Sequence, residues 1–163
     1  MKITIPYTGF NIDKFPPKII QQIKNVFPER NKIFQPRVRF IVRSLDSRKS
    51  IIVEGIIDSG AEYCFFNHEI AEVLDIPIET GKIIEVCGVG GIRPAYFHKV
   101  EFTFNLFGSK ENIIKYEINV GFFPKEEDKY TEPCLLGEYG FFNRFKVNFN
   151  LAKYNFELEP SFE

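Results

Sequence analysis

Apolar and polar residues alternate along much of this chain in the way that β-strands require. Val38, Phe40 and Val42 alternate with arginines, and a second apolar run at 51–57 follows a polar turn at 46–49. Because successive side chains of a strand point to opposite faces of a sheet, these segments are predicted to form a β-hairpin with one buried face. Shorter apolar runs predict further strands over residues 2–5, 63–66, 82–86, 96–107, 113–122 and 134–137, and a closing hairpin over 145–158.

Helical spacing of apolar residues is confined to short segments. Five apolar residues fall at helical spacing within residues 18–27, directly after a Pro-Pro pair that suits a helix start. Asn67 can cap a second short helix over residues 69–74, and a third is predicted over residues 138–144. The chain is therefore expected to be mainly β, with few and short helices.

Length and composition favour a single β-rich domain with an N-terminal extension. With 163 residues, of which 44% are apolar, the chain is long enough for one hydrophobic core and short for two. Nineteen Phe and seven Tyr residues favour strands, whose half-buried faces suit flat side chains. Residues 1–36 are interrupted by prolines and show no core of their own, so we expect an arm with one short helix packed on a domain formed by residues 37–163.

The distribution of charge excludes some classes of partner. The 21 basic and 22 acidic residues are spread along the sequence and leave a net charge of -1, whereas nucleic acid or an anionic membrane calls for a concentrated basic face. No stretch approaches the roughly 18 uncharged apolar residues of a membrane span, and the N-terminus has no long apolar segment. We expect a cytoplasmic protein with neither nucleic-acid nor membrane partners.

The spacing of cysteines and histidines argues against a disulfide framework and against a metal site. Cys64, Cys87 and Cys134 are odd in number and show no C-x-x-C pair, so they are expected to be buried free thiols. His68 and His98 lie far apart, without a second ligand at a familiar spacing. A nucleophilic pair of Cys64 with His68 has little support, because a Cys in an aromatic-rich strand is usually inert core. No metal and no cofactor are expected.

An acidic residue stands where an apolar strand ends. The apolar run over 51–57 leads directly into Asp58-Ser59-Gly60-Ala61, where glycine permits a tight backbone turn. No other aspartate in the sequence is followed by Ser-Gly. A strand that ends in a polar turn yields such a segment by chance, so this segment alone is also consistent with a purely structural turn.

Two further segments favour a functional interpretation of this loop over a purely structural one. A glycine-rich tip at 88–91 lies between two predicted strands, and Leu-Leu-Gly at 135–137 precedes a predicted helix and hairpin. Together with the loop at 58–61, their order and approximate spacing within residues 37–158 resemble the retropepsin-like, or retroviral-type, aspartic proteases. A phosphate-binding loop fits the glycine-rich tip poorly, because a strand pattern and not a helix start follows it. An ordinary glycine-rich β-turn stays open as an alternative.

The resemblance implies a closed acid-protease β-barrel with one or two short helices and a glycine-rich flap hairpin. It implies that Asp58 is the catalytic carboxylate. In the same loop, Ser59 would brace the two loops of a dimer, Gly60 would form the tight turn, and Ala61 would leave room for substrate. The flap would consist of Gly88, Val89, Gly90 and Gly91. The structural support behind the loop would consist of Leu135, Leu136 and Gly137.

The implied activity is that of an aspartic endopeptidase. Two carboxylates held close together cannot both ionise cheaply, so they share one proton and act as base toward water and as acid toward the leaving amide. Because the chain carries one such loop, the resemblance implies a homodimer acting on an extended peptide or protein substrate. The alternative is a non-catalytic dimerisation or peptide-binding module on the same fold, since a fold does not fix a function.

Overall fold

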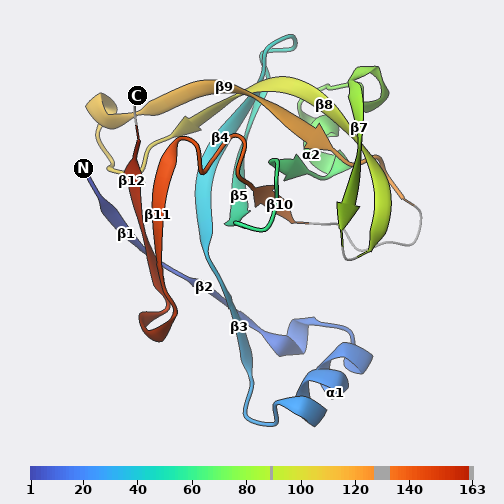
Figure 1. Ribbon diagram of the computed structural model, residues 1–163, viewed down its shortest axis with the longest axis vertical. Helices are drawn as coiled ribbons and strands as arrows, with labels where there is room; N and C mark the ends of the chain where they lie inside the picture. The colour runs from blue at the N-terminus through green and yellow to red at the C-terminus, as the bar shows by residue number, and fades with distance from the viewer. Residues whose placement is uncertain (89, 127–132, 162–163) are drawn as a thin grey trace.

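Strands dominate the structure, and six of them close into a barrel (Figure 1). The computed structural model describes residues 1–88, 90–126 and 133–161. The strands of the barrel sheet are β4 (Arg37–Ser44), β5 (Ser50–Ile57), β6 (Phe65–Phe66), β7 (Lys82–Gly88), β8 (Gly91–Phe104), β9 (Ile114–Phe122) and β10 (Cys134–Leu136). Their order is β4-β5-β10-β6-β9-β8, and β8 pairs back onto β4, while β7 extends the sheet beyond β8. The predicted mainly β, closed-barrel fold is confirmed.

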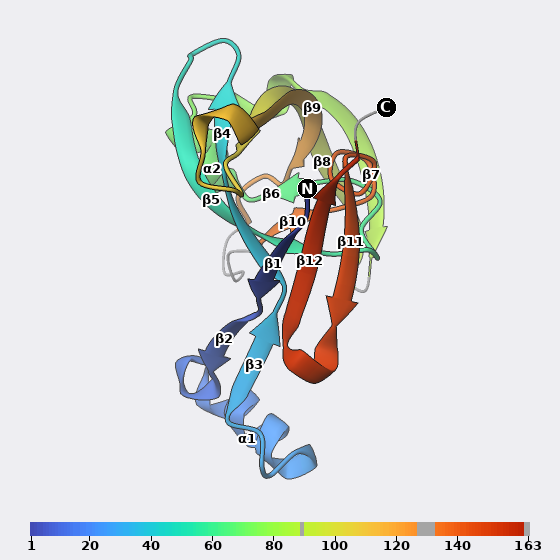
Figure 2. The same cartoon turned by 90° about the vertical axis from the view of Figure 1, so that its left-hand side faces the viewer.

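The N-terminal arm adds one strand to a second sheet and then leaves the barrel. This sheet has the order β1-β12-β11 and consists of β1 (Ile3–Pro6), β11 (Phe145–Asn150) and β12 (Asn155–Pro160). A separate pair of strands, β2 (Thr8–Asn11) and β3 (Lys32–Gln35), carries α1 (Pro17–Val26) at the end of the projection seen in Figures 1 and 2.

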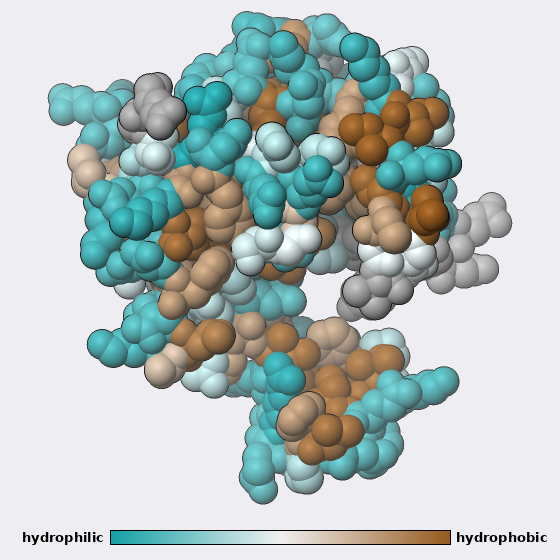
Figure 3. Space-filling model, viewed as in Figure 1, coloured by the Kyte–Doolittle hydropathy of each residue, from teal (hydrophilic) through white to brown (hydrophobic). Residues whose placement is uncertain are grey.

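The helix of the arm is uncovered. None of the ten described residues of α1 is buried. Ile19 and Val26 within it, and Phe27 directly after it, are exposed to solvent. Figure 3 accordingly shows apolar surface on the projecting part of the molecule. The arm therefore holds its position through strand pairing and not through burial of its helix.

Phenylalanine rings fill the barrel. The Phe40 ring stacks on Phe104 with ring centroids 4.9 Å apart and meets Phe102 edge-on at 4.8 Å. The fully buried phenylalanines are Phe66, Phe102, Phe104, Phe122, Phe141, Phe145 and Phe156. Because burying such a side chain contributes about 1.5–3 kcal/mol, this cluster explains why the sequence is so rich in Phe.

The helical segments in the described chain are short. The second α-helix is α2 (His68–Val73), and the side chain of Asn67 caps it, as predicted, by accepting a hydrogen bond from the N–H of Ile70. The 3-10 turns are Ile12–Lys14, Ile78–Thr80, Lys110–Asn112 and Leu151–Lys153. Among the described residues, no helix has the length and apolar character needed to cross a membrane.

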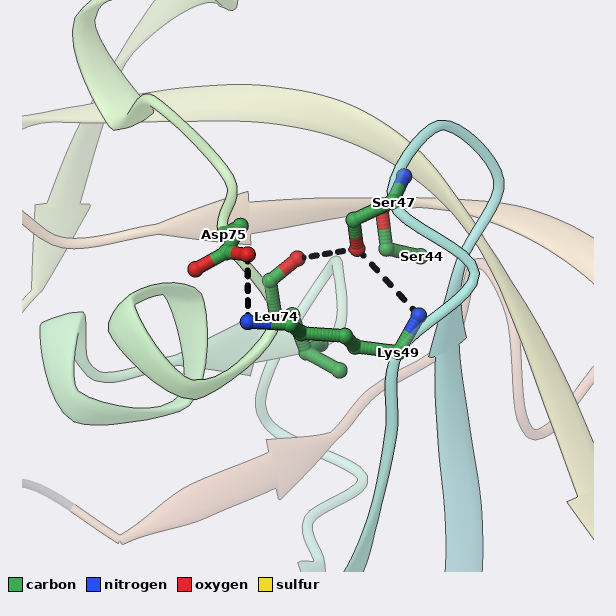
Figure 4. Close-up of polar contacts among 5 residues, drawn as sticks. All are labelled: Ser44, Ser47, Lys49, Leu74 and Asp75. Atoms are coloured by element: carbon green, nitrogen blue, oxygen red, sulfur yellow. Dashed lines mark hydrogen bonds and ion pairs between the residues drawn. The ribbon is translucent and has the colours of Figure 1, made fainter.

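A small polar network ties the C-terminal end of α2 to the turn between β4 and β5 (Figure 4). The Ser47 hydroxyl donates to the carbonyl of Leu74 at 2.6 Å and accepts from the N–H of Lys49 at 3.2 Å. The Lys49 ammonium also pairs with the Asp75 carboxylate at 2.5 Å, with both side chains more than half exposed. Exposed ion pairs contribute little, so the hydroxyl of Ser47 is the main link in this network.

The helix predicted over residues 138–144 is wrong, and hydrogen-bonded turns stand in its place. Gly140 adopts a φ of +118°, which a right-handed helix excludes. Its N–H donates to the side-chain oxygen of Asn143 at 3.0 Å, and the Tyr116 hydroxyl donates to its carbonyl at 2.7 Å. A Cβ at this position would overlap the side chain of Ile118. Packing against β9 therefore requires glycine here, and its conformation interrupts the helical pattern.

Two of the three cysteines are buried, as predicted, and the third is not. Cys64 and Cys134 lie in the barrel, where burial raises the pKa of each thiol to about 12. Cys87 is exposed, so the prediction is wrong there. It lies in β7, close to the tip of the β7–β8 hairpin, where almost every residue of β7 is open to solvent.

Candidate active site

The Asp58 loop is held in place by backbone hydrogen bonds. The N–H of Asp58 donates to the carbonyl of Leu136 at 3.0 Å, which continues the pairing of β5 with β10 by one residue. The N–H of Gly60 donates to Oδ1 of Asp58 at 2.9 Å, and the N–H of Ala61 donates to the Asp58 carbonyl at 3.2 Å. The loop therefore fixes both the backbone and the carboxylate of Asp58.

The strand β10 lies between the two strands that the loop connects. It runs parallel to β5, with Leu135 opposite Ile56 and Leu136 opposite Ile57. On its other side it runs antiparallel to β6, with Leu135 opposite Phe65. Residues distant in sequence thus form the base on which the loop stands.

Gly137 packs directly against the backbone of the loop. A Cβ at this position would lie 2.3 Å from the carbonyl oxygen of Tyr63 and 2.5 Å from that of Ala61, distances that no side chain can take up. The N–H of Glu138 then donates to the Ala61 carbonyl at 2.9 Å. The close approach of these two backbones explains why glycine follows the two leucines.

The loop faces the tip of the β7–β8 hairpin across one cleft of about 630 Å³. The residues predicted from the sequence that line this cleft are Asp58, Gly60, Ala61, Gly88, Gly90, Gly91 and Leu135. Ser59 is exposed and lines a neighbouring hollow with Tyr139, whereas Leu136 is fully buried behind the loop. Val89 lies outside the described residues. The structure therefore brings the loop and the glycine-rich tip together around one space.

Several residues that the sequence did not single out also line this cleft. Tyr63, Phe65 and Phe123 form an aromatic wall, in which the rings of Phe65 and Phe123 stack at 5.1 Å. Glu62 and Arg93 are further charged residues that line it. Arg93 is brought there by the register of the β7–β8 hairpin, a long-range feature that a local sequence pattern does not specify.

The Tyr63 hydroxyl stays protonated at neutral pH. Desolvation raises the pKa of Tyr63, and the carboxylate of the adjacent Glu62 raises it further. This hydroxyl is therefore neutral and can both donate and accept a hydrogen bond.

The histidines have structural surroundings. His68 occupies the first turn of α2, and Nε2 of His98 lies 2.8 Å from the carbonyl oxygen of Ile78. Within the described part of the chain, no group of three His, Cys, Asp or Glu side chains is placed to hold a metal ion.

Comparison with known proteins reveals similarity only to solved structures. No protein-family model matches this chain, and no curated protein matches it. A retropepsin-like aspartic protease from Rickettsia conorii is similar, with 17% identity, a TM-score of 0.47, and coverage of 76% of this chain and 92% of that one. The EIAV protease, complexed with the inhibitor HBY-793, is similar with 17% identity, a TM-score of 0.37, and coverage of 64% of this chain and 82% of that one. Both similarities concern the fold and assign no role to individual residues.

Proposed function

We propose that this protein is an aspartic endopeptidase that acts as a homodimer, with Asp58 of each copy forming the catalytic pair. The observation that carries this proposal is the position of Asp58, whose partly exposed carboxylate lies in a peptide-sized cleft and is oriented by the N–H of Gly60. The aromatic wall of the same cleft suits the apolar side chains of an extended peptide.

The proposed chemistry needs two carboxylates that share one proton. The ionised carboxylate takes a proton from a water molecule, whose oxygen attacks the carbonyl carbon of the scissile bond. The protonated carboxyl group first donates a hydrogen bond to the carbonyl oxygen. A proton then passes to the amide nitrogen as the carbon–nitrogen bond breaks. The two pKa values belong to the pair and not to either copy of Asp58.

A second copy of the chain is the proposed source of the second carboxylate. The sequence contains one Asp-Ser-Gly segment, so a two-fold axis beside the loop would place Asp58 next to its own copy. Ser59 and Gly60 are exposed on the loop and so accessible to such a partner. In this arrangement the Ser59 hydroxyl would brace one loop against the other.

The β7–β8 hairpin is the proposed flap. A Cβ on Gly88 or Gly90 would meet no atom within 4 Å, so packing does not demand glycine at either position. Gly91 has a φ of +102° and is needed for the turn itself. Bare backbone at the tip suits close contact with the main chain of a substrate, which gives affinity while tolerating different side chains.

A peptide-binding module without catalysis is the second candidate. The aromatic wall of Tyr63, Phe65 and Phe123 favours it, because this wall could hold a peptide without any contribution from Asp58. The two candidates differ in whether the bound peptide is cut.

The decisive experiment compares the wild-type protein with Asp58→Asn. The Asn side chain keeps the size of Asp but cannot act as base, so cleavage of a mixed peptide library is expected to fall by at least about a thousandfold while the dimer, measured by sedimentation, persists. Asp46→Asn, at an exposed position in the β4–β5 turn, is the matched control and should cut normally. Cleavage that survives in Asp58→Asn, or a wild-type protein that binds peptides but never cuts them, would refute the protease proposal.

A further inference from the structure

Arg93 projects from the β7–β8 hairpin into the same cleft as Asp58. In the hairpin it pairs with Val86, and two residues further along β8 comes Ala95, which is fully buried. Since alternate residues of a strand share a face, Arg93 lies on the face that the hairpin turns toward the interior. It lines the cleft together with Asp58 and Phe123.

Two contacts orient the guanidinium group of Arg93. Its central carbon lies 3.9 Å from the centroid of the Phe123 ring, a close cation–π contact. Its Nη2 lies 3.3 Å from Oε1 of Glu126. The Arg93 side chain is 23% exposed and that of Glu126 is 32% exposed, so the pair is partly shielded from solvent at the edge of the cleft.

Arg93 differs in the sign of its charge from the other charged residues that line the cleft. Among the described residues that line the cleft, the charged ones are Asp58, Glu62 and Arg93, and Arg93 alone is basic. A guanidinium carries its N–H groups in a planar fork, which matches the two oxygens of a carboxylate. Glu126 already supplies one such carboxylate from within the chain.

We propose that Arg93 determines specificity by receiving the side-chain carboxylate of an Asp or Glu residue of the substrate, which takes over the position of Glu126. This inference rests on the proposed protease function. The aromatic wall would accept apolar side chains beside the scissile bond, while Arg93 selects an acidic residue nearby. In a two-fold dimer the cleft holds two copies of Arg93, so the preference for an acidic residue arises on both sides of the scissile bond.

The test uses pairs of peptides based on a sequence that the wild-type protein cuts. The two peptides of a pair differ at one position, which is Glu in one and Gln in the other, and this position is moved along the sequence from pair to pair. The assay is run at a pH above the ordinary carboxyl pKa, so that Glu is ionised. For the wild-type protein, kcat/KM is expected to be about tenfold or more higher for the Glu peptide at the responsive position, the size expected of a charge-assisted hydrogen bond. The preference should appear mainly in KM, because the contact is made before the chemical step.

Variants at position 93 separate recognition from folding. Arg93→Met removes the charge and should bring the Glu/Gln ratio to about one, while the Gln peptide is still cut. Arg93→Glu should reverse the preference toward a Lys peptide at the same position. Because each result is a ratio within one variant, partial unfolding cancels out. Lys99→Met, on the same strand but outside the cleft lining, is the control and should leave the ratio unchanged.

Glu126→Gln tests the exchange of carboxylates. It removes the carboxylate that pairs with Arg93 at 3.3 Å, so the KM for the Glu peptide should fall several-fold while the KM for the Gln peptide changes little.

Each outcome has a distinct meaning. A Glu/Gln ratio near one at every scanned position in the wild-type protein, or a ratio that survives in Arg93→Met, would overturn the role of Arg93 and leave the protease function standing. If the wild-type dimer cuts no peptide at all, the protease function fails. Fluorescence anisotropy with Glu and Gln peptide pairs, built on a sequence that the protein binds, then tests Arg93 by binding. Equal affinity for the Glu and Gln peptides in that measurement would overturn the inference.

Discussion

The two sides of the cleft use glycine for opposite reasons. We call Asp58–Ala61, β10 and Gly137 the floor, and residues 86–88 and 90–93 of the β7–β8 hairpin the roof. On the floor, a Cβ at Gly137 would lie 2.3 Å from a backbone oxygen of the loop. On the roof, a Cβ at Gly88 would meet nothing within 4 Å. Packing demands glycine at position 137 of the floor, whereas it makes no such demand at position 88 of the roof.

The cysteines show the same contrast. Cys134 belongs to the floor and is buried, and Cys64 lies buried directly before β6, which pairs with β10. Cys87 belongs to the roof and is exposed. Under the proposed function, a fixed floor would hold the Asp58 carboxylate in place, and an open roof would admit and release an extended peptide.

The largest effect is expected from Gly137→Ala. The added Cβ cannot fit without separating β10 from the loop, because its close neighbours are backbone atoms. We expect the free energy of unfolding, measured by urea denaturation, to fall by about 3 kcal/mol or more. Gly88→Ala is the matched control. If both variants unfold at the same urea concentration, the contrast between floor and roof is refuted.

We predict a loss of stability at alkaline pH, because two thiols are buried in the folded protein. Burial raises the pKa of Cys64 and of Cys134 from about 9 to about 12, so in the unfolded chain these thiols ionise at lower pH than in the folded one. Their contribution is therefore intact below about pH 9 and is progressively lost as the pH rises toward 12. Urea midpoints measured across this interval should show the decline.

Substitutions test whether the two buried thiols cause this decline. The double variant Cys64→Ala, Cys134→Ala should flatten the dependence of the urea midpoint on pH, whereas Cys87→Ala should leave it as steep as in the wild-type protein. A double variant with the wild-type slope would show that other groups cause the decline.

Local sequence patterns predicted the strands of the barrel, but they missed the pair β2 and β3 in the N-terminal arm. Val38, Phe40 and Val42 point into the barrel as their spacing requires, and Asn67 caps α2 as its position before an apolar run suggests. The loop at Asp58 could be found because a tight turn restricts residue types locally. Its catalytic role stays a prediction.

Features that depend on long-range contacts could not be read from the sequence. Position 140 requires glycine because Ile118, more than twenty residues earlier, occupies the space of a side chain. Cys87 was predicted to be buried, but it is exposed because β7 extends the sheet beyond the barrel. Arg93 reaches the cleft through the register of β7 with β8, and the residues of the tip reveal no such register by themselves.

A smaller effect is expected from Gly91→Ala on the roof. No atom lies within 4 Å of the added Cβ, but the φ of +102° is unfavourable for any residue with a Cβ. We expect a cost of about 1 kcal/mol in the free energy of unfolding, which comes from the backbone alone. Urea denaturation beside Gly137→Ala measures it. A loss as large as that of Gly137→Ala would show that the roof is packed after all.

The smallest effect on stability, and the sharpest test of the comparison, is expected from Gly88→Ala. Its Cβ meets no atom and its φ is not positive, so the free energy of unfolding should stay within about 0.5 kcal/mol of the wild-type value. Under the proposed function, the methyl group would still hold the main chain of a substrate away from the roof, and kcat/KM for peptide cleavage should fall several-fold. Lys82→Ala, at the base of the same hairpin, provides the control and should change neither quantity appreciably. Unchanged cleavage in Gly88→Ala would mean that substrate does not contact the roof at this glycine, and that the openness of the tip has no catalytic purpose there.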